Sequence, residues 1–150
     1  MKSDYLKYWR VVRQYVKARY GIGQSDLDIL LFLYSEKYFG KEKFDEFAEL
    51  VSWDEDRFKR LLRDGWIENF RVKLNHRKAI YALSYKSKRM IESIYKKLEG
   101  EEISEVAGNN PMFRKKVSYI DKVYRNMIKE MNKEIKAKKL TGQQPHLSPE

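Results

Sequence analysis

"FDEFAELVSWDEDRFKRLLRDGWIENF", residues 44–70, is the stretch in which the chain changes from one hydrophobic period to another. Before Gly65 the apolar residues recur every three or four positions, which indicates helices, whereas from Trp66 onward apolar and polar residues alternate, which indicates a strand. Ser52 and Glu55 have the spacing of a capping box, so a helix is expected to begin there, with Gly65 as its stop. The stretch therefore predicts two short helices followed by a β-strand.

The sequence after Gly65 predicts a β-hairpin. "WIENFRVK" (residues 66–73) and "AIYALS" (residues 79–84) read as strands, and the polar "LNHRK" between them has the length of a hairpin turn. Ile67, together with Phe70 or Val72, is expected to face the core. Residues 71–90 contain seven lysines and arginines and no acid. Four residues are expected at the tip: Asn75, His76, Arg77 and Lys78.

Helices are expected on both sides of this region. The first runs to about residue 19 and carries an apolar stripe of Tyr5, Trp9, Val12 and Val16. Ser25 is a plausible N-cap for residues 26–38, which are apolar almost all round and so belong in a core. After the hairpin, a further helix is expected up to Gly100, with a stripe of Met90, Ile91, Ile94, Tyr95 and Leu98.

The C-terminal part predicts a linker, a long helix and a tail. Residues 100–110 lack a periodic pattern and are expected to be a linker. Asn110 as N-cap and Pro111 as first helical residue then open the last helix, whose apolar residues follow a near-heptad spacing. Residues 111–140 carry a net charge of +7, which also suits an acidic protein partner or a membrane surface. Residues 141–150 have nothing to bury and are expected to be disordered.

The composition limits the possible functions. The 150 residues are 42% hydrophobic, enough for one core, and the net charge of +10 favours a polyanionic partner such as nucleic acid. There is no cysteine, and the two histidines, His76 and His146, are far apart in sequence, so we expect no metal and no cofactor. Neither a signal peptide nor an apolar run of about 18 residues is present, so a cytoplasmic protein with no membrane contact is expected.

Residues 24–89 resemble the winged helix-turn-helix of MarR-type transcription regulators. The resemblance is carried by "YGIGQSDLDILLFLY" (residues 20–34), by residues 44–70 with their Leu-x-x-x-Gly-x-Ile ending at Leu61, Gly65 and Ile67, and by "NHRKAIYALSYKSK" (residues 75–88). It covers about residues 5–139. It implies a mainly α fold with a small β-hairpin, forming one domain of residues 1–140 in which residues 1–20 and 111–139 are dimerisation arms.

The same resemblance implies a homodimeric, sequence-specific regulator of transcription that binds double-stranded DNA. The fourth helix would enter the major groove, and the basic hairpin would lie on the minor groove or the backbone, with Arg77 at the position of the family's wing arginine. If Phe58, Leu61 and Leu62 face inward, Arg57 and Arg60 point outward to guanine edges, and Lys59 and Arg63 suit phosphates. The full set of expected DNA-binding residues is Trp53, Arg57, Lys59, Arg60, Arg63, Arg71, Lys73, His76, Arg77 and Lys78.

The resemblance also implies how two copies would associate. The first and last helices would interlock across a two-fold axis, because a helix with an apolar seam must pack against something. The expected dimerisation residues are Tyr5, Trp9, Val12, Phe113, Val117, Ile120, Tyr124, Met127 and Met131. The resemblance also implies a small aromatic effector, bound in a pocket like that of many regulators of this family. The residues that would either line this pocket or belong to the hydrophobic core are Tyr5, Tyr8, Trp9, Tyr15 and Tyr20.

The charge pattern keeps a second function open. Residues 41–65 carry a net charge of −2, whereas residues 66–90 carry +6, and the start of the fourth helix is acidic. Asp54 and Glu55 fit helix capping, while Trp53 either packs under the preceding turn or anchors a partner. The alternative is thus a structural or assembly protein, for example a phage virion or replication component, that uses the fold for protein contacts. An enzyme is not expected, because the sequence has no Gly-rich phosphate loop, no histidine pair and no nucleophile with a base.

Overall fold

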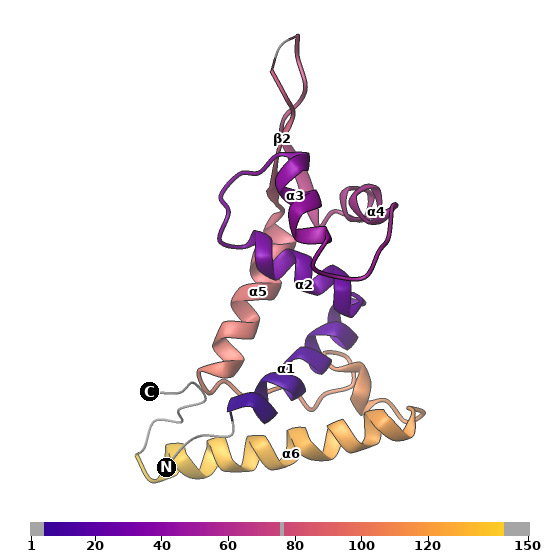
Figure 1. Ribbon diagram of the computed structural model, residues 1–150. Helices are drawn as coiled ribbons and strands as arrows, with labels where there is room; N and C mark the ends of the chain where they lie inside the picture. The colour runs from indigo at the N-terminus through magenta and orange to yellow at the C-terminus, as the bar shows by residue number, and fades with distance from the viewer. Residues whose placement is uncertain (1–4, 76, 143–150) are drawn as a thin grey trace. The chain divides into compact units, whose positions relative to one another are not determined.

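The computed structural model describes residues 5–75 and 77–142, which are mainly helical with one small antiparallel sheet (Figure 1). The mainly α fold class with a β-hairpin is therefore confirmed. His76 and residues 143–150, including His146 and most of the expected tail, lie outside the described residues. The elements are α1 (Tyr5–Tyr20), α2 (Gln24–Leu33), α3 (Lys41–Ala48), α4 (Arg57–Arg63), β1 (Ile67–Arg71), β2 (Ile80–Leu83), α5 (Tyr85–Leu98), the 3₁₀ turn η1 (Pro111–Phe113) and α6 (Tyr119–Leu140).

The chain divides into two compact units. Residues 22–91 form the central unit, which contains α2, α3, α4 and the hairpin. Residues 1–21 and 92–150 form the terminal unit, which contains α1, η1 and α6. Helix α5 begins in the central unit and ends in the terminal unit, since its residues 85–91 belong to the former and 92–98 to the latter.

Helix α2 lies in the core of the central unit, as its sequence predicts. Leu27, Ile29, Leu30 and Leu33 are each fully buried, because a helix that is apolar on nearly every side can be stable only when surrounded. The predicted N-cap was wrong by two residues. Gly23 is the N-cap and Ser25 lies inside the first turn.

Helix α4 ends at the predicted glycine. Gly65 has φ +79°, and the Trp66 amide donates to the Leu61 carbonyl at 2.9 Å while the Gly65 amide donates to the Leu62 carbonyl at 3.2 Å. This pair of bonds is a Schellman motif, which needs a left-handed residue and therefore favours glycine. Trp66, 5% exposed, follows directly and packs in the core.

The sheet is a two-stranded hairpin whose strands pair from Ile67 with Leu83 to Arg71 with Ile80. A bulge between Asn69 and Arg71 shifts the register, which leaves Phe70 without a partner across the ladder. Ile67 is buried as predicted, but Phe70 and Val72 are 59% and 58% exposed and do not face the core.

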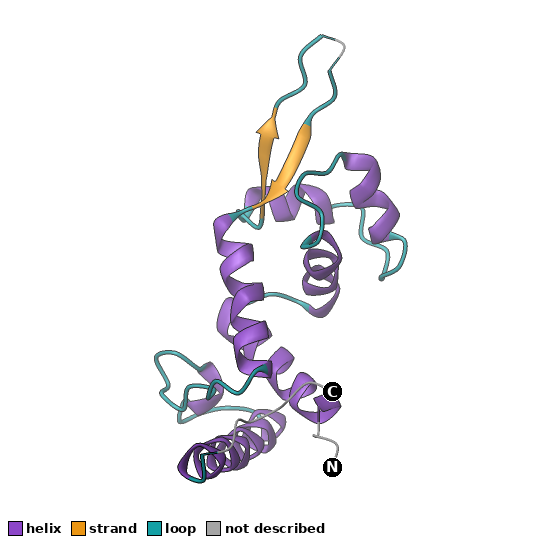
Figure 2. Cartoon of the chain, turned by 90° about the vertical axis from the view of Figure 1, so that its left-hand side faces the viewer, coloured by secondary structure: helices purple, strands orange, loops and turns teal. Residues whose placement is uncertain are grey.

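Aromatic rings connect α3, α4 and the hairpin. Phe44 of α3 meets Phe58 of α4 edge to face at 4.9 Å between ring centroids, and Phe58 meets Tyr81 of β2 in the same way at 4.9 Å. Phe39 also pairs with Tyr81 through two backbone hydrogen bonds of 3.0 and 2.8 Å. The hairpin is thus fixed to the helices at its base, and Figure 2 shows its far end extending away from them.

In the terminal unit, α1 packs against η1 and α6. The buried side chains of α1 are Tyr8, Val11, Val12, Tyr15 and Val16. The predicted stripe shared only Val12 and Val16 with this face, because Trp9 and Tyr5 are half-buried at its border.

The predicted long C-terminal helix is broken into two parts. Asn110 does cap a helical turn, accepting a hydrogen bond from the Met112 amide at 3.1 Å, but that turn is η1 and ends at Phe113. Helix α6 starts only at Tyr119, where the Ser118 hydroxyl accepts from the Asp121 amide at 3.1 Å. A second capping residue therefore restarts the helix.

The predicted linker is ordered by α6. Ile103 is 1% exposed, and both its amide and its carbonyl are bonded to the side chain of Asn132, at 3.0 and 2.7 Å. Asn132 is itself 2% exposed. A buried amide side chain thus substitutes for a strand partner of this segment, because buried backbone groups need hydrogen bonds.

Candidate nucleic-acid interface

The far end of the hairpin extends away from the last strand pair, Arg71 with Ile80. We name this part, residues 71–75 and 77–79, the arm. Leu74 and Arg77 close its tip through two backbone hydrogen bonds of 3.2 and 2.8 Å. Asn75 has φ 51°, a left-handed conformation that asparagine tolerates better than most residues. The predicted position of the tip is therefore confirmed, with Asn75, Arg77 and Lys78 at or next to it.

The cations of the arm differ in their partners. Lys78 donates to Glu42 of α3 at 2.6 Å, and the Arg71 guanidinium donates to the Lys78 carbonyl at 3.3 Å. Lys73 and Arg77 are exposed, and within the part of the chain that the structure describes no carboxylate lies within ion-pair distance of either. These two side chains are the cations of the arm that can accept an anionic partner without first losing an acid.

The Lys78–Glu42 pair is fully exposed. The hydrogen bond to Glu42 raises the pKa of Lys78, and the same bond lowers the pKa of Glu42. Both side chains are at least 80% exposed, so water and salt screen the pair strongly. Glu42 is therefore a weak competitor for Lys78 when phosphates approach.

A hollow of about 520 Å³ lies between the arm and α3. Four lysines and two glutamates are among its lining residues, so its walls are charged and cationic on balance. The lining residues are Gly40, Lys41, Glu42, Lys43, Glu46, Lys73, Lys78, Ala79 and Tyr81.

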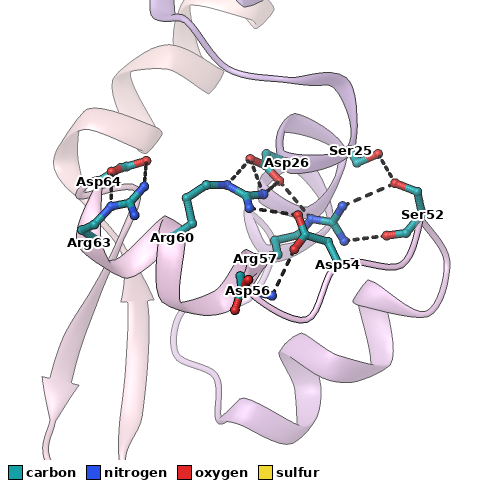
Figure 3. Close-up of polar contacts among 9 residues, drawn as sticks. All are labelled: Ser25, Asp26, Ser52, Asp54, Asp56, Arg57, Arg60, Arg63 and Asp64. Carbon is teal, nitrogen blue, oxygen red and sulfur yellow. Dashed lines mark hydrogen bonds and ion pairs between the residues drawn. The ribbon is translucent and has the colours of Figure 1, made fainter.

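Helix α4 does not present the arginines that the sequence predicted for base contacts. The helix begins at Arg57, five residues after the expected start, and Arg57 is 3% exposed. Its Nε donates to Asp26 of α2 at 2.9 Å and its Nη1 to the Ser52 carbonyl at 2.8 Å (Figure 3). The predicted outward position of Arg57 was wrong, because its guanidinium is buried and held by a carboxylate.

Arg60 is held by the same carboxylate. Its Nη2 lies 2.8 Å from Asp26 and its Nη1 lies 2.9 Å from Asp54, and Figure 3 shows Arg57 and Arg60 converging on Asp26. Hydrogen bonds to Asp26 and then to Asp54 raise the pKa of Arg60, and the bond from Arg60 lowers the pKa of Asp54.

The remaining predicted contacts of α4 are at the surface. Lys59 is exposed, and Arg63 is exposed but pairs with its neighbour Asp64 at 2.9 Å, which lowers the pKa of Asp64. Phe58 and Leu62 are half-buried and Leu61 is buried, so the predicted inward face is confirmed. The error lay in the start of the helix, which places Arg57 underneath the loop instead of on the outer face.

The capping box predicted at Ser52 and Glu55 is absent, because the residues 52–56 form a loop before α4. The Ser52 hydroxyl instead lies 2.9 Å from that of Ser25, and the N-cap Asp56 makes no side-chain cap bond. Asp54 accepts from the Asp56 amide at 3.0 Å, so it stabilises the loop and not the helix end. Trp53, in the middle of this loop, is 86% exposed and does not pack under the preceding turn.

Reasoning from the sequence did not predict an exposed aromatic pair at the base of the arm. Tyr38 and Phe70 stack with 4.2 Å between ring centroids, although they are 44% and 59% exposed. Lys37 lies over the Tyr38 ring at 5.7 Å. The bulge that turns Phe70 outward depends on strand register, which no local pattern in residues 66–73 reveals.

The expected dimerisation residues are divided between surface and core. Val12 and Met131 are buried within the chain, so in this conformation they cannot meet a second copy. Ile120 is 62% exposed, and the other six, Tyr5, Trp9, Phe113, Val117, Tyr124 and Met127, are half-buried. The near-heptad seam therefore does not continue along one surface, because α6 starts late and its second half packs on its own unit.

The tyrosines expected around an effector mostly belong to the core of the terminal unit. Tyr8 and Tyr15 are each 6% exposed; the Tyr8 hydroxyl bonds to Glu134, and burial raises the pKa of Tyr15. The hollow in this unit lies elsewhere and measures about 420 Å³. Its lining residues are Lys7, Arg10, Ile120, Val123, Tyr124 and Met127.

Comparisons with known proteins add no family. No protein-family model matches the chain, and no curated protein matches it either. Among residues 5–75 and 77–142, no group of three or more histidines, cysteines, aspartates or glutamates is placed to hold a metal ion. None of the helices in the described parts of the chain has both the length and the apolar character needed to cross a membrane.

Proposed function

We propose that the central unit is a winged helix-turn-helix that binds double-stranded DNA, with the hairpin arm as its main contact and phosphates as its main target. The order of three helices, a hairpin and a further helix supports the assignment of the unit. The observation that carries the function is the pair Lys73 and Arg77, which are exposed on an arm that extends beyond the helices and have no carboxylate partner among the described residues.

Phosphate binding follows from the charge of the arm. Each cation that neutralises a DNA phosphate releases condensed counterions, which is a large favourable term at low salt. Residues 69–91 contain no aspartate or glutamate, so the arm and the start of α5 do not repel a phosphate backbone. Arg77 at the tip is the side chain best placed to enter a minor groove, where arginine is favoured by the narrow, negative environment.

Helix α4 has a smaller part in this proposal than the family resemblance implies. Arg57 and Arg60 are neutralised by Asp26 and Asp54, which leaves Lys59 and the Asp64-paired Arg63 on the exposed face. Residues 44–56 contain six acids and no base, and these repel phosphates from the start of α4. Binding should therefore depend more on salt than on DNA sequence, unlike that of a regulator that reads many base edges.

The test is the salt dependence of binding to a short duplex. In the variant Lys73→Gln/Arg77→Gln, the slope of log affinity against log salt should fall by about 1.8, because each lost phosphate contact removes about 0.9. The matched control is Lys88→Gln/Arg89→Gln, which removes the same charge from exposed positions on α5. An equal fall in both variants would mean that net charge alone drives binding, and no measurable binding by the unmodified protein would refute the proposal.

A second measurement addresses base recognition. Selection from a mixed duplex pool by the unmodified protein and by Arg60→Gln should give the same weak sequence preference, because Arg60 is held by Asp26 and Asp54. A single enriched motif that disappears in Arg60→Gln would show that this ion cluster opens on DNA and that α4 reads bases.

A further inference from the structure

The loop before α4 presents an apolar surface surrounded by acids. Trp53 and Leu50 are 86% and 67% exposed, although both are large apolar side chains. Glu49, Glu55 and Asp56 are also exposed, and none of them has a cation within ion-pair distance among the described residues. We name residues 49–56 the acidic loop.

The acidic loop is held in place from beneath. Arg57 binds the Ser52 carbonyl at 2.8 Å, and Arg60 binds Asp54 at 2.9 Å, so both neighbours of Trp53 in the chain are fixed (Figure 3). The Asp56 amide is bonded to Asp54 at 3.0 Å. Because the backbone on both sides of Trp53 is fixed, little loop entropy would be lost when Trp53 binds a partner.

The terminal unit carries a surface of opposite character. Its hollow of about 420 Å³ lies between α1 and α6 and is lined by four apolar or aromatic side chains of α6 together with Lys7 and Arg10 of α1. Ile120 and Val123 are 62% and 40% exposed. No carboxylate pairs with Lys7 or Arg10 within residues 5–75 and 77–142. We name this surface the basic groove.

We propose that the acidic loop of one copy docks into the basic groove of a second copy, so that the chains associate head to tail. Trp53 would fill the apolar part of the groove, since tryptophan is one of the residues enriched among those that contribute most to binding. Glu55 and Asp56 would then meet Lys7 and Arg10. The matching of an acidic, apolar loop with a basic, apolar groove is the observation that selects a second copy as the partner.

Charge also selects the arrangement. A two-fold contact of groove with groove would bring four cations together, and loop with loop would bring carboxylates together, and both are unfavourable. Only the loop-to-groove contact pairs opposite charges. A reciprocal exchange of loop and groove about a two-fold axis would pair the same charges but would close at a dimer. In the head-to-tail form that we propose, each copy that joins leaves one free loop and one free groove, so growth continues with concentration unless the rotation closes a ring. The inference does not depend on DNA binding, because it concerns the protein alone.

The test is a mixing experiment followed by sedimentation velocity. Trp53→Ala removes the loop contact and keeps the groove, whereas Val123→Lys blocks the groove and keeps the loop. Each variant alone should stay monomeric, with self-association weakened at least about tenfold. An equimolar mixture should form a one-to-one dimer and nothing longer, because only one productive contact exists per pair.

Two further variants check the cause. Leu140→Ala removes an apolar side chain that is 88% exposed and belongs to neither surface, so it should associate like the unmodified protein. Lys7→Glu/Arg10→Glu should abolish association, and adding Glu55→Lys/Asp56→Lys to it should restore association by reversing both charges. Circular dichroism of each variant should match the unmodified protein, since every substituted side chain is at least partly exposed.

Several results would overturn the inference. They are a protein that remains monomeric at every concentration, association that stops at a two-fold dimer, and association that Trp53→Ala leaves unchanged. A mixture of the two variants that stays monomeric would likewise refute it, because the intact loop and the intact groove would then fail to bind each other.

Discussion

At the residue scale, Asp26 determines what two arginines do. It lies on α2 and accepts hydrogen bonds from both Arg57 and Arg60 of α4, at distances of 2.8 to 2.9 Å for the shortest contacts. Arg57 is almost fully buried, so its charge is tolerated only because the carboxylate and the Ser52 carbonyl surround it. The cluster joins α2 to α4 and fixes the loop that exposes Trp53, and in doing so it removes both arginines from the surface available to DNA.

Loss of Asp26 should therefore cost much more stability than loss of an exposed acid. We expect Asp26→Ala to lower the free energy of unfolding by about 3–5 kcal/mol, because Arg57 would keep its buried charge without a partner. Urea denaturation measures this change. The matched control is Glu42→Ala, which removes the exposed partner of Lys78 and should leave the free energy of unfolding almost unchanged. Similar losses in the two variants would contradict the structural role given to Asp26.

At the element scale, capping and stopping residues determine where the helices lie. Gly65 ends α4 through a left-handed conformation, and Ser118 restarts a helix that Asn110 had begun eight residues earlier. The late start of α6 moves Ile120 and Val123 onto the surface beside Lys7 and Arg10. The basic groove is thus a consequence of where α6 begins.

Replacement of Gly65 tests its role in ending α4. Gly65→Ala should destabilise the protein by about 1 kcal/mol, because φ +79° is strained for alanine while open space surrounds the new methyl group. Gly108→Ala is the control, since Gly108 also has open space but lacks the positive φ of Gly65. Thermal unfolding compares the two. A larger cost at Gly108 than at Gly65 would mean that backbone conformation is not the cause.

At the scale of the whole molecule, the two proposed surfaces belong to different tasks. The arm of the central unit would hold phosphates, and the loop and groove would join copies. The net charge of +10 resides mostly in the terminal unit, which carries 18 lysines and arginines against 10 acids, so bound DNA would also lower the repulsion between copies that associate as we propose. A protein with both surfaces would cover DNA cooperatively, because each bound copy offers a site to the next.

Cooperativity should therefore depend on duplex length and on Trp53. On a duplex that accommodates one copy, Trp53→Ala and the unmodified protein should bind with equal affinity and equal salt slope. On a duplex that accommodates many copies, the unmodified protein should bind cooperatively and the variant should not. Fluorescence anisotropy titrations on both duplexes measure this. Equal cooperativity of the two proteins on the long duplex would separate DNA binding from the proposed self-association.

Local patterns in the sequence determined the elements of this protein. The change of period at Gly65, the nearly all-apolar run of α2 and the polar turn at residues 74–78 predicted the helices, the core and the basic hairpin, since helix period, burial and turn formation depend on neighbouring residues. The break between η1 and α6 also has a local signal in the sequence, because Ser118 is a capping residue. Asn110 and Pro111 form an equally good helix start, however, so the sequence alone did not predict the break.

The functional surfaces were decided only by tertiary structure. Whether Arg57 and Arg60 are free at the surface depends on Asp26, which is about thirty positions away in the sequence, and the loop that exposes Trp53 is held by bonds that those arginines make. Lys7 and Val123 share one groove although more than a hundred residues separate them. Charges and apolar side chains can be counted in a sequence, but which of them remain free at the surface depends on which partners the fold brings within hydrogen-bond distance.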